Sequence, residues 1–69
     1  MRKDERQVLD YLRTNFGSEN KMYVNFKFLA KDLDICYHNL NMSLNNLEKE
    51  KHIIHYDLTE DDMFIVLNK

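Results

Sequence analysis

The chain contains no proline, no tryptophan, one glycine and one cysteine in 69 residues. A single cysteine excludes an internal disulfide, so we expect a reducing, cytoplasmic setting. No apolar run approaches the roughly 20 residues that cross a bilayer, and the charged N-terminus lacks the apolar core of a secretory signal. With one glycine, the chain offers no phosphate-binding loop and no nucleophile elbow. We therefore expect no enzyme, no cofactor and no small-molecule substrate.

Positive charge is slightly outnumbered by negative charge and is unevenly placed. The net charge is −2, whereas a free-standing binder of duplex DNA is expected to be basic. The N-terminal segment carries Arg2, Lys3, Arg6 and Arg13. By contrast, residues 53 to 68 contain four acids and no Lys or Arg. Any attraction to phosphate must therefore come from the N-terminal half of the chain.

The first half of the chain has the apolar periodicity of two helices. A stripe at helical spacing predicts a helix over residues 3–16, and Gly17 is a natural stop after it. A loop and a short extended piece follow, and Asn25 is placed to cap a second helix over residues 26–33. Asp34 then occupies a turn position that often needs a positive φ, which Asp tolerates better than most residues.

The second half predicts a third helix and a β-hairpin. Leucines at i, i+4 and i+7 predict a helix over residues 37–51, with Cys36 at its cap. Two apolar runs then flank a turn of about four residues, which predicts a hairpin over residues 53–67. We expect the core to consist of Leu12, Leu29, Leu33, Ile35, Leu40, Leu44 and Leu47.

This order of elements resembles the winged helix-turn-helix domain of the bacterial type over nearly the whole chain. The matching pieces are LAKDL in the second helix, the corner at Asp34 and Ile35, the L-x-x-x-L-x-x-L-E pattern from Leu40 to Glu48, and Ile53 at the start of the hairpin. The resemblance implies a single domain over residues 1–69, mainly α with a small β-hairpin, in which three helices carry a wing of two or three strands. It also implies that the third helix enters the major groove.

The resemblance also defines candidate nucleic-acid-binding residues. The exposed side of the third helix would supply Tyr37, His38, Asn39, Asn41, Met42, Asn45 and Asn46. Arg2, Lys3 and Arg6 are candidate phosphate contacts, with a solvated helix face as the alternative because acids are interleaved with them. Asparagine pairs well with adenine, so the third helix either reads A·T-rich sequence or docks another protein. Without Lys or Arg there, and with an acidic turn at 60–62, we expect weak intrinsic affinity.

Three histidines and the cysteine raise the question of a metal or redox site. His52 and His55 are three residues apart near a strand start, so they would point to opposite faces, and no Cys or acid stands at ligand spacing. His38 lies far from both in the sequence. We therefore expect no metal site. Cys36 at a helix start could sense oxidants, but a passive role is favoured because the chain has no resolving cysteine.

Apolar residues outside the expected core are candidates for a protein interface. Phe28 falls on the side of the second helix opposite its buried stripe, and residues 63–67 are apolar on both faces of a strand. One face of that strand can cover the core, and the other can contact a partner, because a small monomer seldom leaves an apolar patch bare. The alternative is a compact core that absorbs both faces. The partner-binding candidates are Phe28, Ile54, Tyr56, Phe64 and Val66.

Two functions fit these observations best. In the first, which the sequence favours, the chain is a non-enzymatic accessory subunit that binds a larger DNA-processing protein, with a slight preference for replication or primer synthesis on a mobile element of a low-GC bacterium. In the second, it is a small transcriptional regulator, dimeric through the hairpin or the first helix, that reads an AT-rich operator with Asn39, Asn41 and Asn45. A third interpretation is a structural module without nucleic acid. The isolated protein should bind DNA well only in the second case.

Overall fold

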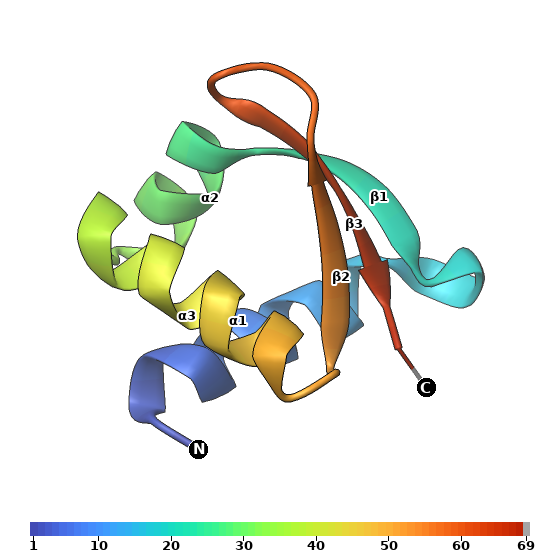
Figure 1. Ribbon diagram of the computed structural model, residues 1–69, viewed down its shortest axis with the longest axis horizontal. Coiled ribbons are helices and arrows are strands. Elements are labelled where there is room, and N and C mark those ends of the chain that lie inside the picture. Colours follow the sequence, from blue (N-terminus) through green and yellow to red (C-terminus); the bar gives the residue numbers. More distant parts are fainter. Residues whose placement is uncertain (69) are drawn as a thin grey trace.

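Three helices pack against one face of a three-stranded antiparallel sheet in the computed structural model, which describes residues 1–68 (Figure 1). The helices are α1 (Lys3–Asn15), α2 (Phe26–Leu33) and α3 (Tyr37–Lys49), with a short 3-10 turn, η1 (Gly17–Glu19), after α1. The strands are β1 (Lys21–Asn25), β2 (Ile53–Asp57) and β3 (Asp62–Leu67), in the spatial order β1-β3-β2. The predicted helices and hairpin are all present, and the short extended piece becomes the third strand of the sheet.

Local signals in the sequence set most helix boundaries. Asn25 Oδ1 accepts a hydrogen bond from Phe28 N at 2.9 Å at the start of α2. Cys36 Sγ accepts one from Asn39 N at 3.5 Å at the start of α3. Gly17 (φ 65°) and Asp34 (φ 55°) take the left-handed conformation after α1 and α2. Both turn predictions are therefore confirmed, since a left-handed residue ends a right-handed helix.

Two helices end earlier than their periodicity predicts. α3 stops at Lys49 instead of residue 51, because Lys51 adopts φ 66° and cannot continue the helix. Within this closing turn, Lys51 N donates to Glu48 O and His52 N donates to Leu47 O, each at 2.9 Å. α1 likewise ends at Asn15, one residue before the predicted end.

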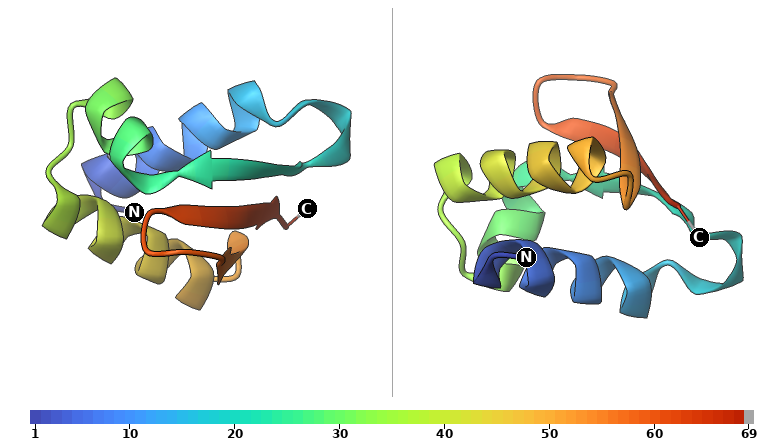
Figure 2. Two further views of the ribbon diagram at one scale, coloured as in Figure 1. Left: turned by 90° about the horizontal axis from the view of Figure 1, so that it is seen from above. Right: turned by 60° about the horizontal axis from the view of Figure 1, so that its bottom comes forward.

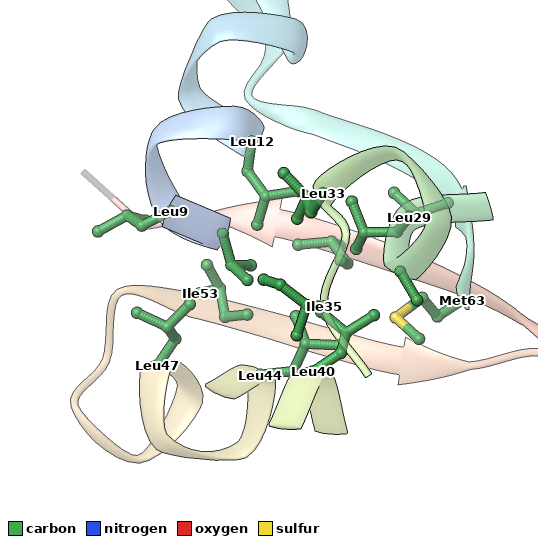
Figure 3. Close-up of a cluster of buried hydrophobic side chains, with 14 of the residues drawn as sticks. Leu9, Leu12, Leu29, Leu33, Ile35, Leu40, Leu44, Leu47, Ile53 and Met63 are labelled. Carbon is green, nitrogen blue, oxygen red and sulfur yellow. The ribbon is translucent and has the colours of Figure 1, made fainter. Parts of the chain in front are cut away.

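The core fills the space between the helices and the inner face of the sheet (Figure 3). All seven residues predicted for the core are buried. The sheet completes it with Val24 from β1, Ile53 from β2, and Met63 and Ile65 from β3. Because β3 is the central strand, its two inward side chains, Met63 and Ile65, lie in the middle of the inner face of the sheet.

The alternation of β3 also creates a second, exposed surface. Tyr23 of β1 and Tyr56 of β2 lie opposite Phe64 of β3, on the face turned away from the helices. Ile54 is 42% exposed and Tyr56 54% exposed. The interpretation that a compact core absorbs both faces is therefore wrong, because the helices cover only one side of the sheet. We call the other side the outer sheet face; it carries Lys21, Tyr23, Asn25, Ile54, Tyr56, Asp62, Phe64 and Val66.

Leu44→Ala tests the packing of α3 on the core. Leu44 is only 1% exposed, so the substitution should lower the free energy of unfolding by about 2 to 5 kcal/mol. Urea denaturation followed by circular dichroism measures this loss. Met42→Ala, on the exposed side of the same helix, is the matched control and should change stability by less than about 0.5 kcal/mol. Equal unfolding midpoints for the two variants would contradict the packing.

Candidate nucleic-acid interface

The exposed side of α3 forms a polar strip bordered by three other segments. We call it the recognition strip; it consists of Tyr37, His38, Asn39, Asn41, Met42 and Asn45, all exposed. α1 runs beside α3, and the β2–β3 hairpin projects on the other side (Figure 2). α2 meets the N-terminal end of the strip, where the Phe26 and Tyr37 ring centroids are 5.6 Å apart. The strip is therefore the exposed side of a helix whose other side packs in the core.

Three asparagines give the recognition strip its hydrogen-bonding capacity. The side-chain amides of Asn39, Asn41 and Asn45 have no hydrogen-bond partner within residues 1–68, and all three residues are exposed. Asn41 and Asn45 are one helical turn apart and both line the cleft between α3 and the hairpin. Each free amide offers both a donor and an acceptor, which is the combination that pairs with the major-groove edge of adenine.

Asn46 differs from the other asparagines of α3 in its surroundings. Its Nδ2 donates to Glu5 Oε2 at 3.1 Å, and Glu5 is only 4% exposed. The amide therefore joins α1 to α3 and satisfies a buried carboxylate. While this bond is in place, Asn46 is a structural residue at the edge of the recognition strip, although it shares the helix face of the predicted binding residues.

Cations reach the recognition strip from its borders. Arg2 lines a hollow together with Asn39 and Met42, and it lines a second hollow with Lys49 at the end of α3. Lys3 and Arg6 are also exposed on α1, where Arg6 Nε lies 3.9 Å from Asp10 Oδ2. An exposed ion pair of this length is weak, so Arg6 remains available to other anions.

Two lysines of α2 border the N-terminal end of the strip. Lys27 and Lys31 are one turn apart and line a shallow groove with Tyr37 and the exposed Phe28. Sequence reasoning did not assign these lysines to the interface, nor Lys49. Their spacing on the polar side of α2 is visible in the sequence, but the approach of α2 to Tyr37 is a tertiary contact that periodicity does not reveal.

The hairpin brings negative charge to the opposite border of the strip. Asp57 and Glu60 line the same cleft as Asn41 and Asn45. The other two acids of the hairpin contact side chains of this chain. Asp61 Oδ2 lies 3.5 Å from Lys27 Nζ. The Asp62 carboxylate accepts hydrogen bonds from Asn25 Nδ2 at 2.9 Å and from Thr59 Oγ1 at 3.1 Å. The recognition strip therefore has a cationic border at α1 and α2 and an acidic border at the hairpin.

The remaining polar candidates serve local structure. His55 Nδ1 lies 3.0 Å from Glu48 Oε1, and the same oxygen accepts a hydrogen bond from His55 N at 2.8 Å, so the carboxylate links α3 to β2. His52 Nε2 lies 3.9 Å from Glu50 Oε2. No group of three metal-ligating side chains occurs within residues 1–68. None of the helices in that range has the length and apolar character of a membrane-spanning segment.

Comparison with solved structures identifies the architecture. The Zα domain of PKZ from Carassius auratus, solved in complex with Z-DNA, superposes with a TM-score of 0.69 at 20% identity, over 94% of each chain. MepR, a transcription regulator of the Staphylococcus aureus multidrug efflux pump MepA, superposes with a TM-score of 0.73 at 22% identity. NadR, solved with 4-hydroxyphenylacetate, gives 0.71 at 20% identity. The fold is a winged helix-turn-helix.

The coverage of these structures differs. The chain is covered over 99% of its length by both regulators, but it spans only 47% of MepR and 45% of NadR. By contrast, the match to the Zα domain extends over 94% of both chains. No protein-family model matches the chain, and no curated protein matches its sequence at a significant level. At these identities the likeness establishes the fold, and the function has to be argued from the residues of this chain.

Asn46→Ala tests the division between structural and free asparagines on α3. Removing the Asn46 amide leaves the Glu5 carboxylate buried without this donor, which should cost about 1 to 3 kcal/mol of unfolding free energy. Asn45→Ala is the matched control, because its amide is free and exposed, and it should stay within about 0.5 kcal/mol of the parent. Urea denaturation of both variants measures the difference. Equal stabilities would mean that the bond to Glu5 contributes nothing.

Proposed function

We propose that the chain binds duplex DNA by placing α3 in the major groove, with Asn41 and Asn45 contacting bases. The observation that carries this proposal is the row of free amides on a helix whose other side is anchored in the core. An α-helix fits the major groove of B-DNA, and an asparagine paired in bidentate fashion with adenine contributes about 1 to 3 kcal/mol of discrimination. A·T-rich sites are therefore the expected targets.

Cations at the borders of the strip supply the phosphate contacts in this proposal. Arg2 and Lys49 lie along one side of α3, and Lys27 and Lys31 lie at its N-terminal end. Phosphate contacts position a protein on DNA, whereas base contacts give the specificity. Because the cations are few and the hairpin is acidic, affinity for random duplex should be poorer than the roughly 10⁻⁴ to 10⁻⁶ M typical of non-specific binding.

The comparisons support a regulator more directly than the other candidate functions. One structural neighbour was solved on Z-DNA and another is a transcription regulator. A small sequence-specific regulator that reads an AT-rich operator is therefore our first choice, in place of the accessory subunit that the sequence alone favours. In this function the free protein must recognise its site without help, since no other protein supplies the phosphate contacts.

An accessory subunit of a larger DNA-processing protein is the second candidate function. Two observations favour it: Asp57 and Glu60 place negative charge beside the amides, and Phe28 is 62% exposed beside Lys27 and Lys31 on α2. In this case the partner would hold the nucleic acid and the chain would bind the partner through the hairpin and α2. Replication or primer synthesis would be a natural setting, and the isolated protein would bind DNA very weakly.

Selection from a random duplex pool tests the first function. The protein should enrich A·T-rich sites, and Asn41→Ala combined with Asn45→Ala should weaken binding to an enriched duplex by about tenfold or more, while binding to random duplex stays nearly unchanged. Fluorescence anisotropy measures both affinities. Asn15→Ala, an exposed asparagine at the end of α1, is the control and should behave as the parent. If selection enriches nothing, the regulator is excluded and the accessory function becomes the better candidate.

The acids of the hairpin provide a separate test of how the domain faces DNA. Asp57→Asn combined with Glu60→Gln removes two charges from the cleft beside Asn41 and Asn45, so affinity for random duplex at low salt should rise severalfold if DNA lies there. Glu19→Gln combined with Asp32→Asn changes the net charge equally, away from the recognition strip, and should have a smaller effect. Equal effects of the two pairs would indicate that the hairpin does not approach DNA.

A further inference from the structure

The outer sheet face carries a row of three aromatic rings, one from each strand. Tyr23, Phe64 and Tyr56 occupy a single register row across β1, β3 and β2. The ring centroid of Phe64 lies 4.9 Å from that of Tyr23 and 6.5 Å from that of Tyr56. Tyr23 is 74% exposed and Tyr56 54% exposed. The rings support one another in the isolated chain, so a partner would meet a surface that is already ordered.

Aliphatic side chains extend this row into a continuous apolar patch. Ile54 and Val66 follow on one side of the aromatic row, in register with each other. Leu58, which is 53% exposed, begins the hairpin turn on the other side. Contiguous apolar surface of this kind is uncommon on a monomer and marks an interaction site, whereas single exposed apolar residues are ordinary.

The charges on this face decide what kind of partner it fits. Lys21 is the one cation on the outer sheet face as defined above, so the face lacks the positive groove that binds single-stranded nucleic acid along its backbone. Its one acid, Asp62, lies on the opposite side of the aromatic row. In register, Lys21 pairs with Val66 and Asn25 pairs with Asp62, so the two charges lie at opposite ends of the patch.

We infer that the outer sheet face is the interface of a two-fold symmetric dimer of this chain. A two-fold axis along the aromatic row reverses the strand direction, so Lys21 of each copy faces the end that holds Asp62 of the partner subunit. Each charge then meets its opposite, and this happens twice because the interface is isologous. An axis along the strands would instead bring the two Lys21 ends together. The charge pattern therefore selects the first arrangement.

Such a dimer agrees with the general geometry of packed sheets. Two sheets pack face to face about 10 Å apart with their strands within about 30° of one another. The aromatic rows of the two copies would meet on the axis, with the tyrosine hydroxyls free to reach solvent or polar groups at the rim. The helices lie on the other side of each sheet (Figure 1), so the recognition strips remain uncovered. The inference goes beyond the proposed function and is tested without DNA.

Sedimentation equilibrium tests whether the chain self-associates through this face. The parent should form dimers in a concentration-dependent manner, and Tyr23→Lys combined with Tyr56→Lys should raise the dissociation constant by about tenfold or more. Both tyrosines are exposed, so the variant should keep the parent circular dichroism spectrum. Phe28→Ser, at an exposed aromatic residue outside the outer sheet face, is the control and should leave association unchanged.

A charge exchange tests the symmetry itself. Lys21→Glu and Asp62→Lys should each weaken self-association, because each variant meets like charges twice across the axis. An equimolar mixture of the two variants should form a heterodimer more readily than either variant forms a homodimer, since both contacts again join opposite charges. This rescue also shows that the Asp62→Lys chain is folded. A dimer in which Lys21 of one copy lies far from Asp62 of the other would not produce this rescue.

Three results would overturn the inference. The first is a parent chain that stays monomeric at millimolar concentration. The second is a dimer that the tyrosine substitutions leave intact. The third is binding of a fluorescent single-stranded oligonucleotide that is lost in the Tyr23→Lys and Tyr56→Lys variant, because this would assign the outer sheet face to nucleic acid.

Discussion

The pairing of β3 with both other strands is the constraint on which the rest of the structure depends. β1 and β2 do not pair with each other, so the sheet exists only because β3 lies between them. Successive residues of a strand point to opposite faces. Met63 and Ile65 are therefore committed to the core, and Phe64 and Val66 are committed to the outer sheet face. One strand thus anchors the helices on one side and creates an apolar surface on the other.

The helical period divides α3 in the same way, into one buried side and one exposed side. Leu40, Leu44 and Leu47 are at most 1% exposed, which fixes the rotation of the helix about its axis. The positions left outward are those of the recognition strip, and the Glu5–Asn46 hydrogen bond ties one edge of this surface to α1. Under the proposed function, the packing of α3 already holds the backbone that carries these amides, so only the asparagine side chains have to be ordered when they pair with bases.

Much of the fold could be predicted from the sequence, because burial imposes a period on each helix and strand. The leucine spacing located the core, and Asn25, Asp34 and Gly17 marked turns through their own conformational preferences. What the sequence did not reveal depends on contacts between distant segments. The pairing of β1 with β3, the engagement of Asn46 by Glu5, and the approach of Lys27 and Lys31 to Tyr37 each join residues that no local pattern connects. The candidate residues of the third helix share one face of α3 as expected, but their individual environments could not be predicted, and their role in binding nucleic acid stays a prediction.

The charges around the recognition strip would orient a bound duplex in a way that the fold alone does not specify. Arg2 and Lys49 border the recognition strip on the side of α1, and Asp57 and Glu60 border it on the side of the hairpin. A phosphate backbone is attracted to the first border and repelled by the second, so a duplex bound to α3 would lie closer to α1 than to the hairpin. Lys27 is partly neutralised by Asp61, which weakens the attraction at the end nearest the hairpin. Under the proposed function, the wing therefore contributes less to DNA binding than α1 does, and its acids act mainly against non-specific attachment.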